Sequence, residues 1–229
     1  QQSYGELNPA LEMLLAEVKA EGGDLDGATC MTLQYALVHA AQRCDWSCVQ
    51  SLAEAVTSRG GDPNLFVDLD PTSQYPYYEV RNWGDGALFP IENWAQSSAD
   101  GVRIAQALEF VKGLLDHPQF SMDALLGAQE LIRAPGEHIV VKLVRELGRM
   151  GSQKGRPMVE ATDYVLQVLV LMREKGFQLN KLGMKLAEVL SDTVPLSIIQ
   201  QVGEDCGVSW SQLPLRESLR GRYFSDPSV

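Results

Sequence analysis

Apolar residues recur along most of this chain at intervals of three and four residues, the spacing that places them on one face of an α-helix. The pattern predicts helices over residues 3–22, 31–44, 45–60, 98–117, 121–132, 139–147, 158–175, 181–191 and 195–206, followed by a short tail over 213–229. No stretch alternates apolar and polar residues over the length of a useful strand. The sequence therefore predicts an all-α fold built from antiparallel pairs of helices.

Two of the predicted helices end in the same way. Arg59-Gly60 closes one and Lys175-Gly176 closes the other, and an asparagine follows each glycine after four residues, at Asn64 and Asn180. Glycine adopts the left-handed conformation that ends many helices without steric strain, and a cation beside it interacts favourably with the helix dipole. Two copies of one pattern predict helical hairpins that stack on one another as a short α-solenoid.

The segment 61–97 interrupts the helical pattern with four prolines and several glycines. It is also rich in aromatic residues, in which disordered linkers are poor. We therefore expect one long ordered loop, packed either against the helices or against another protein. The aromatic residues that would form such a protein interface are Tyr75, Tyr77, Tyr78, Trp83, Phe89 and Trp94.

The charge of the chain changes near residue 137. Residues 1–137, which include the loop, hold 7 basic against 20 acidic side chains, a net −13. Residues 138–229, which include the tail, hold 12 against 10, a net +2. We therefore divide the chain into an acidic helical half, 1–137, and a nearly neutral helical half, 138–229. The acidic half should repel nucleic acid, whereas the second half need not.

A group of basic residues lies in the second half. Lys142, Arg145 and Arg149 share one helix face, and Lys154 and Arg156 continue the group into the following loop. Such a stripe could contact phosphates, or it could be the solvated face of an ordinary surface helix. The sequence leaves both interpretations open.

The second half also contains the motifs of a known repeat. Residues 143–151 read LVRELGRMG and residues 172–180 read MREKGFQLN, which resembles the two helices of a pentatricopeptide repeat, and 35–64 is similar to a second copy. That family stacks hairpins of roughly 35 residues into solenoids that read single-stranded RNA, often one base per repeat. The resemblance implies that Asn64 and Asn180 occupy base-selecting positions.

The first copy also supports a rival resemblance. Val38-His39-Ala40-Ala41, followed by Arg59-Gly60-Gly61-Asp62-Pro63-Asn64-Leu65, is similar to an ankyrin repeat, whose second helix ends in a Gly-x-Asp-x-Asn turn. Ankyrin hairpin tips are short, whereas the predicted loop after Asn64 is long. We therefore prefer the pentatricopeptide-like interpretation.

The sequence shows no catalytic or cofactor motif. The glycines of 148–155 lack the Gly-Lys-Ser/Thr ending of a phosphate loop. Cys44 and Cys48, with His39 upstream, lack a second pair of metal ligands, so we expect reduced, packed thiols and neither a metal nor a cofactor. No apolar run is long enough to span a membrane.

These observations lead to two main hypotheses. The first is a non-enzymatic helical-repeat scaffold, an intracellular architectural subunit that binds protein partners in a larger assembly. The alternative is a pentatricopeptide-like protein that binds single-stranded RNA inside a mitochondrion or plastid. An enzyme of unrecognised type is a third hypothesis, which the missing motifs disfavour.

Overall fold

The structure, a computed structural model, is mostly helical. It describes residues 27–68, 80–95, 104–121, 125–126, 137–152, 158–190 and 193–205. Its elements are α2 (Gly27–Gln42), α3 (Trp46–Ser58), β1 (Val67–Asp68), β2 (Val80–Arg81), η2 (Trp83–Ala87), α4 (Phe89–Ala95), α5 (Ile104–Asp116), β3 (Leu125–Leu126), β4 (Glu137–His138), α6 (Ile139–Gly151), α7 (Met158–Glu174), η3 (Leu179–Leu182), α8 (Gly183–Val189) and α9 (Leu196–Asp205), where η2 and η3 are 3₁₀ helices. Of the described residues, 76% are helical, which confirms the predicted all-α class. The expected helix over 3–22 and the tail over 213–229 lie outside the described residues.

The two glycine-terminated helices end as their sequences predict. Gly60 and Gly176 follow α3 and α7 with φ angles of 75° and 84°, in the left-handed region. In both, the glycine N–H and the next N–H donate to the carbonyl oxygens three and five residues back, at 2.9 and 3.0 Å. This Schellman arrangement satisfies carbonyl groups that the helix end leaves unpaired. Cys44 ends α2 with the same hydrogen-bond pattern at a φ of 51°.

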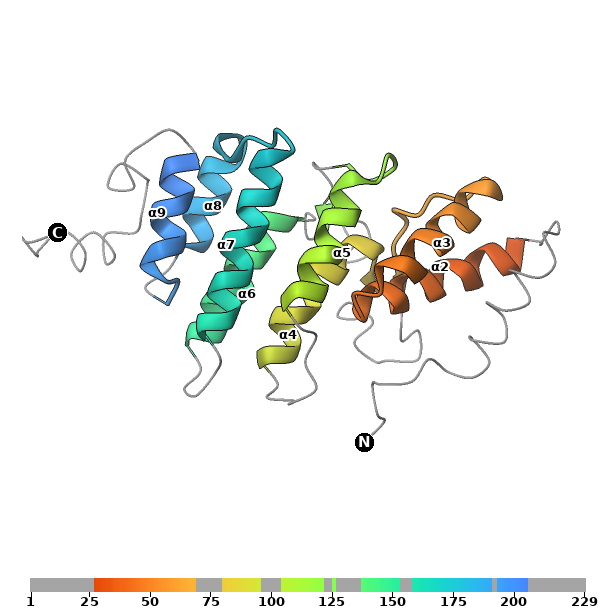
Figure 1. The fold of residues 1–229 in the computed structure, drawn as a ribbon, viewed down its shortest axis with the longest axis horizontal. Coiled ribbons are helices and arrows are strands. Elements are labelled where there is room, and N and C mark those ends of the chain that lie inside the picture. The colour runs from red at the N-terminus through yellow and green to blue at the C-terminus, as the bar shows by residue number, and fades with distance from the viewer. Residues whose placement is uncertain are drawn as a thin grey trace, which may run out of the picture.

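The helices lie side by side in two rows along the long axis of the molecule, from α2 and α3 at one end to α8 and α9 at the other (Figure 1). In the first row α2 contacts η2, η2 contacts α4, α4 contacts α6 and α6 contacts α8. In the second row α3 contacts α5, α5 contacts α7 and α7 contacts α9. Contacts between the rows join α2 to α3, η2 to α5 and α6 to α7. Elements that are distant in sequence are thus held together by neighbour-to-neighbour packing.

One hydrophobic core runs through both halves of the chain. Its cluster includes Leu37 and Phe110 from the acidic half, and Leu143 and Ile199 from the second half. The fully buried Tyr164 adds a polar link, because its hydroxyl donates to the carbonyl oxygen of Ala87 at 2.7 Å. The change of charge near residue 137 therefore does not coincide with a break in the packing. No described helix has the length and apolar character needed to cross a membrane.

The segment 61–97 is not the uninterrupted loop that its prolines predicted. β1 pairs with β2 in antiparallel register, and η2 and α4 follow. Asn82 and Asp85 form a reciprocal capping box that begins η2. Pro90 is the second residue of α4, where its missing N–H is not required for a helical hydrogen bond. Pro90 thus lies at the start of a helix, whereas the sequence predicts that it breaks one.

The short helix predicted over 121–132 is also wrong where the structure describes that region. Leu125 and Leu126 form β3, which pairs with Glu137 and His138 of β4. Strand pairing depends on a partner elsewhere in the chain, which local apolar spacing does not reveal. The helix predicted from residue 98 begins at Ile104 in the described part of the chain.

Candidate functional site

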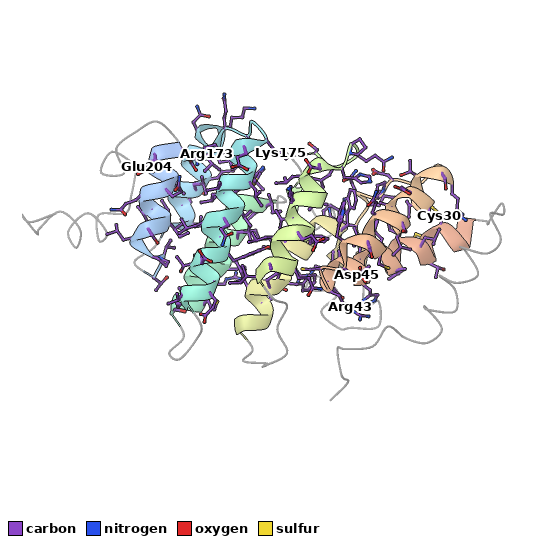
Figure 2. The ribbon with its side chains drawn as sticks, in the orientation of Figure 1. Cys30, Arg43, Asp45, Arg173, Lys175 and Glu204 are labelled. Atoms are coloured by element: carbon purple, nitrogen blue, oxygen red, sulfur yellow. The ribbon has the colours of Figure 1, made fainter. Side chains whose placement is uncertain are left out.

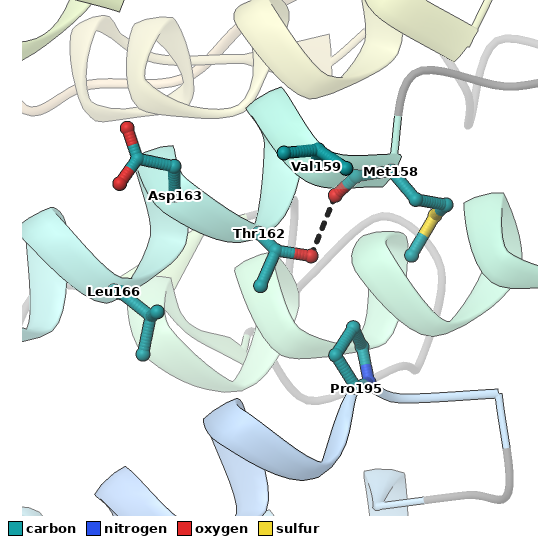
Figure 3. A pocket seen from close by; sticks show the side chains of 6 residues that line it. All are labelled: Met158, Val159, Thr162, Asp163, Leu166 and Pro195. Atoms are coloured by element: carbon teal, nitrogen blue, oxygen red, sulfur yellow. Dashed lines mark hydrogen bonds between the residues drawn. The ribbon is translucent and has the colours of Figure 1, made fainter.

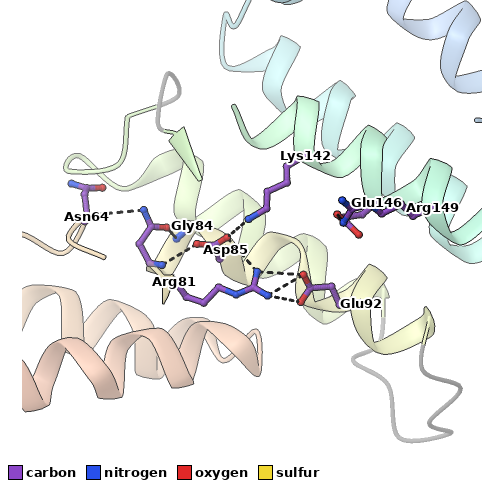
Figure 4. Close-up of polar contacts among 9 residues, drawn as sticks. Asn64, Arg81, Gly84, Asp85, Glu92, Lys142, Glu146 and Arg149 are labelled. Atoms are coloured by element: carbon purple, nitrogen blue, oxygen red, sulfur yellow. Dashed lines mark hydrogen bonds and ion pairs between the residues drawn. The ribbon is translucent and has the colours of Figure 1, made fainter. Parts of the chain in front are cut away.

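Charged side chains gather in the first row where η2 and α4 meet α6, a cluster that we call the charged seam (Figure 4). Its members are Arg81, Asp85, Glu92, Lys142, Arg145, Glu146 and Arg149. The seam brings together residues from both halves of the chain. It includes every described member of the predicted basic stripe.

Asp85 is the buried centre of the charged seam. Its side chain is 0% exposed, and its Oδ1 lies 3.0 Å from Nζ of Lys142 and 3.6 Å from a guanidinium nitrogen of Arg81. Its Oδ2 accepts a hydrogen bond from the backbone N–H of Asn82 at 2.9 Å. One carboxylate thus caps η2 and ties it to α6. Asp85 is not among the residues that the sequence pattern predicted for a site, although its spacing from Asn82 is a capping signal.

Arg81 makes a second ion pair at the edge of the seam. Its guanidinium lies 3.3 Å from Oε1 of Glu92 and 5.2 Å from the ring centroid of Phe89. Phe89, one of the predicted interface aromatics, therefore packs against a cation of the same chain. These contacts hold the start of α4 against the end of β2.

The cations of α6 are paired with carboxylates of the chain itself. Lys142 bonds to Asp85, Arg145 pairs with Glu137, and Arg149 lies 2.6 Å from Glu146. Their side chains differ in exposure, at 19% for Lys142, 39% for Arg145 and 66% for Arg149. An RNA phosphate would have to compete with these carboxylates. Lys154 and Arg156, the other predicted members of the stripe, lie outside the described residues.

Glu146 has a shifted proton affinity. Burial raises the pKa of its carboxyl above the usual range, and Glu92 raises it further, whereas Arg149, Lys142 and Arg145 oppose the shift. Removal from water disfavours the charged form of a carboxyl group, and a neighbouring carboxylate adds repulsion. The cations of the seam therefore offset only part of the increase in the pKa of Glu146.

The two predicted base-selecting asparagines occupy different environments. The side-chain nitrogen of Asn64 donates to the carbonyl oxygen of Gln119 at 3.1 Å and to Asp62 at 2.9 Å, while its oxygen accepts from Nε1 of Trp83 at 3.0 Å. These contacts use both the donors and the acceptor of the Asn64 side chain. Asn180, by contrast, is exposed in η3.

One member of the predicted aromatic interface lies in the core. Trp83 is fully buried, and its ring meets His117 and Phe120 edge to face, with centroids 5.0 and 5.8 Å apart. It therefore belongs to the core between η2 and the end of α5. Trp94 lies in α4, and Tyr75, Tyr77 and Tyr78 lie outside the described residues.

His117 connects this aromatic cluster to α3. Its ring also approaches Trp46 edge to face, with centroids 6.2 Å apart. Burial lowers the pKa of His117 below its ordinary value, and the charge of Glu54 opposes the shift. The neutral imidazole therefore suits its place between two indole rings.

The described cysteines are packed thiols, as the sequence predicts. Cys30, Cys44 and Cys48 are not joined in disulfides, and Cys44 is buried with its thiol donating to the carbonyl oxygen of Gly86 at 3.6 Å. Burial raises the pKa of the Cys44 thiol to about 12, so it stays protonated at neutral pH. The described residues contain no group of three or more metal-ligating side chains.

A second surface feature lies between the N-terminal ends of α7 and α9. Here a groove of about 390 Å³ is lined by Met158, Val159, Thr162, Asp163, Leu166 and Pro195 (Figure 3). The hydroxyl proton of Thr162 is already engaged, because the hydroxyl donates to the carbonyl oxygen of Met158 at 2.6 Å. The lining is therefore largely apolar. The pattern of apolar residues predicts a helix at the α7 positions but does not predict a groove.

The opposite end of α7 is held by ion pairs. Arg173 lies 2.9 Å from Asp205 of α9, and Lys175 pairs with Asp116 of α5. Figure 2 shows Arg173 and Lys175 near one edge of the molecule. These pairs connect successive helices of the second row.

No protein-family model, curated protein or solved structure significantly matches this chain. Its function therefore has to be inferred from its own residues and their geometry.

Proposed function

We propose that this protein is a non-enzymatic scaffold, a short α-solenoid of stacked helical hairpins that serves as an architectural subunit of a larger protein assembly. The observation that carries the proposal is the order of contacts in the two rows, where each helix packs on the next along one continuous core. In a solenoid each repeat contacts only its neighbours and leaves two long faces for other molecules.

The ionisable groups support a structural role over a catalytic one. Among the described residues, the largest pKa shifts belong to Cys44 and Tyr164. Both side chains are buried in the core and form hydrogen bonds to backbone carbonyl oxygens. Catalytic groups with shifted pKa values typically lie in clefts that a substrate can reach. Here burial alone accounts for most of each shift.

The charged seam favours protein partners over RNA. A phosphate backbone binds through cations that exchange their counterions for phosphates. On α6 those cations already face carboxylates of the same chain. The net charge of −11 adds a general repulsion of nucleic acid.

One observation favours the alternative, a pentatricopeptide-like RNA-binding protein of a mitochondrion or plastid. Asn180 is exposed after the Schellman motif of α7, at the position that the resemblance assigns to base selection. Lys181 and Lys185 are exposed close to it in sequence. A strand of RNA that passed this end of α7 would meet an amide and two cations.

The two functions can be separated by measuring single-stranded RNA binding over a salt series. Fluorescence anisotropy of the full chain would be compared with the variants Arg145→Glu/Arg149→Glu and Lys181→Glu/Lys185→Glu, after circular dichroism confirms that both fold. The scaffold predicts weak binding that neither variant changes. Binding that falls steeply with salt and is lost in either variant would overturn it.

A positive test of the scaffold requires a defined partner. Cross-linking in the native source, followed by reconstitution of the purified pair, should give a stoichiometric complex that survives at about 0.3 M salt, where surface charge is strongly screened. A purified protein that forms no complex with any cross-linked candidate would contradict the proposal.

A further inference from the structure

The groove between α7 and α9 combines apolar exposure with a lining that can accept a side chain. The Val159 side chain is 80% exposed, more than the other exposed large apolar residues, Met31 at 52% and Leu65 at 54%. Met158 and Leu166 are only partly buried and pack against the core from the groove floor. Exposed apolar surface of this kind is stabilised when a partner removes it from water.

One residue in the lining of this groove, Asp163, carries a carboxylate, and Glu160 lies three positions before it on α7. Glu160 and Asp163 are both exposed, and neither forms an ion pair with any residue that the structure describes. The side chain of Asp163 accepts a hydrogen bond from Gln167 at 2.9 Å, and its carboxylate lies on the side of the groove away from Pro195 (Figure 3). In the charged seam, by contrast, the carboxylates face cations of the chain. The groove therefore has a largely apolar lining and, on its α7 side, a negative rim that consists of Asp163 with the exposed Glu160 next to it on the helix.

We infer that this groove binds a short basic amphipathic helix of a partner protein. The inference rests on the proposed scaffold function and names the chemistry of one partner. Apolar side chains of that helix would contact Met158, Val159 and Leu166, and its Lys or Arg side chains would face Glu160 and Asp163. The negative rim disfavours the anionic alternatives, RNA and acidic lipid headgroups.

The dimensions of the groove fit such a helix. Its α7 lining extends from residue 158 to 166, which spans about 12 Å at the rise of an α-helix. Two apolar anchors that are one or two helical turns apart cover this length. The volume of about 390 Å³ lies within the range of pockets that bind small ligands or side chains.

The test is a titration of the full chain with designed helical peptides. Binding is monitored through the NMR signals of the Met, Val and Leu methyl groups of the protein. The first peptide is an amphipathic helix of about 15 residues with a leucine face and lysines beside it. The second keeps the leucine face and replaces the lysines by glutamates, and the third keeps the lysines and replaces the leucines by serines. We expect the first peptide to shift the methyl signals of Met158, Val159 and Leu166 with a Kd below about 1 mM. The other two should bind at least about 10-fold more weakly.

Two pairs of variants separate the groove from general effects. Val159→Asp should weaken binding of the first peptide at least about 10-fold, whereas Leu65→Asp, the same change at another exposed apolar site, should not. Glu160→Lys/Asp163→Lys should weaken it similarly, whereas Glu174→Lys at the other end of α7 should have little effect.

Three outcomes would overturn the inference. The first is no shift of these methyl signals at about 1 mM peptide, and the second is equal binding of the lysine and glutamate peptides. The third is a shift that depends on protein concentration without peptide and is abolished by Val159→Asp, which would assign the groove to a second copy of the chain. None of these outcomes decides between the scaffold and the RNA-binding protein, because the RNA salt series tests that choice separately.

Discussion

Replacement of Asp85 by alanine should destabilise the protein more than any single change at its surface. The carboxylate is fully buried and bonds to Lys142, Arg81 and the N–H of Asn82. Its removal leaves the partly buried ammonium of Lys142 and the buried N–H of Asn82 without their acceptor. Breaking a buried ion pair by deleting one partner costs about 3–5 kcal/mol. Because the Lys142 side chain is 19% exposed and can reach water, we expect Asp85→Ala to lower the free energy of unfolding by about 3 kcal/mol.

The assay is equilibrium unfolding in urea, followed by tryptophan fluorescence. The free energy of unfolding of such domains is roughly 5–15 kcal/mol, so a loss of about 3 kcal/mol is a large part of it. Because a loss of this size can prevent Asp85→Ala from folding, Asp85→Asn provides a second variant. The amide of Asp85→Asn can still accept the N–H of Asn82 but loses the charge facing Lys142, so it should cost about 2 kcal/mol.

A double-mutant cycle would assign this loss to the pair itself. Lys142→Met removes the cation, and its combination with Asp85→Asn should reveal a coupling of about 1–3 kcal/mol between the two side chains. The proposed role of the charged seam in joining η2 to α6 would be refuted by a coupling near zero. It would also be refuted by an Asp85→Ala variant that loses less than about 1 kcal/mol.

Two further predictions concern a backbone conformation and a titrating group. Gly60→Ala and Gly176→Ala should each cost about 1–2 kcal/mol in urea unfolding, because both φ angles are positive while no atom lies within 4 Å of an added Cβ. An unchanged stability in both variants would contradict the left-handed helix ends. Burial lowers the pKa of His117 below 6.5, so the unfolded chain binds that proton more tightly and the folded state loses stability as the pH falls through 6.5. The stability advantage of wild type over His117→Phe, measured by urea unfolding, should therefore be larger at about pH 8 than at about pH 5, and the opposite trend would contradict the burial of His117.

Local signals in the sequence predicted the helices and their ends well. Apolar spacing located α6, α7 and α9, and the glycines at 60 and 176 marked two Schellman motifs. Asp45 directly precedes α3 and caps it, because its carboxylate accepts the N–H of Cys48 at 3.1 Å. These features depend on residues within about one turn of each other, so the local sequence contains the necessary information.

Segments with mixed signals were predicted less well. Pro90 suggested a loop but lies in the first turn of α4, and the leucines at 125 and 126 suggested a helix but pair with β4. A proline is compatible with both a helix start and a helix break, and a short apolar run is compatible with both a helix and a strand. The choice in each case depended on which other segment lay beside it.

The sequence by itself determined the helical class and the helix ends, because each follows from neighbouring residues or from residue type. Only the tertiary structure showed that the basic stripe of α6 faces carboxylates, that Asn64 is held by Trp83 and Gln119, and that the α7–α9 groove exists. The bond between Lys142 and Asp85 joins residues 57 positions apart. Such a contact depends on how the two rows of helices bring distant segments together, and no local pattern of hydrophobic and polar residues encodes that distance.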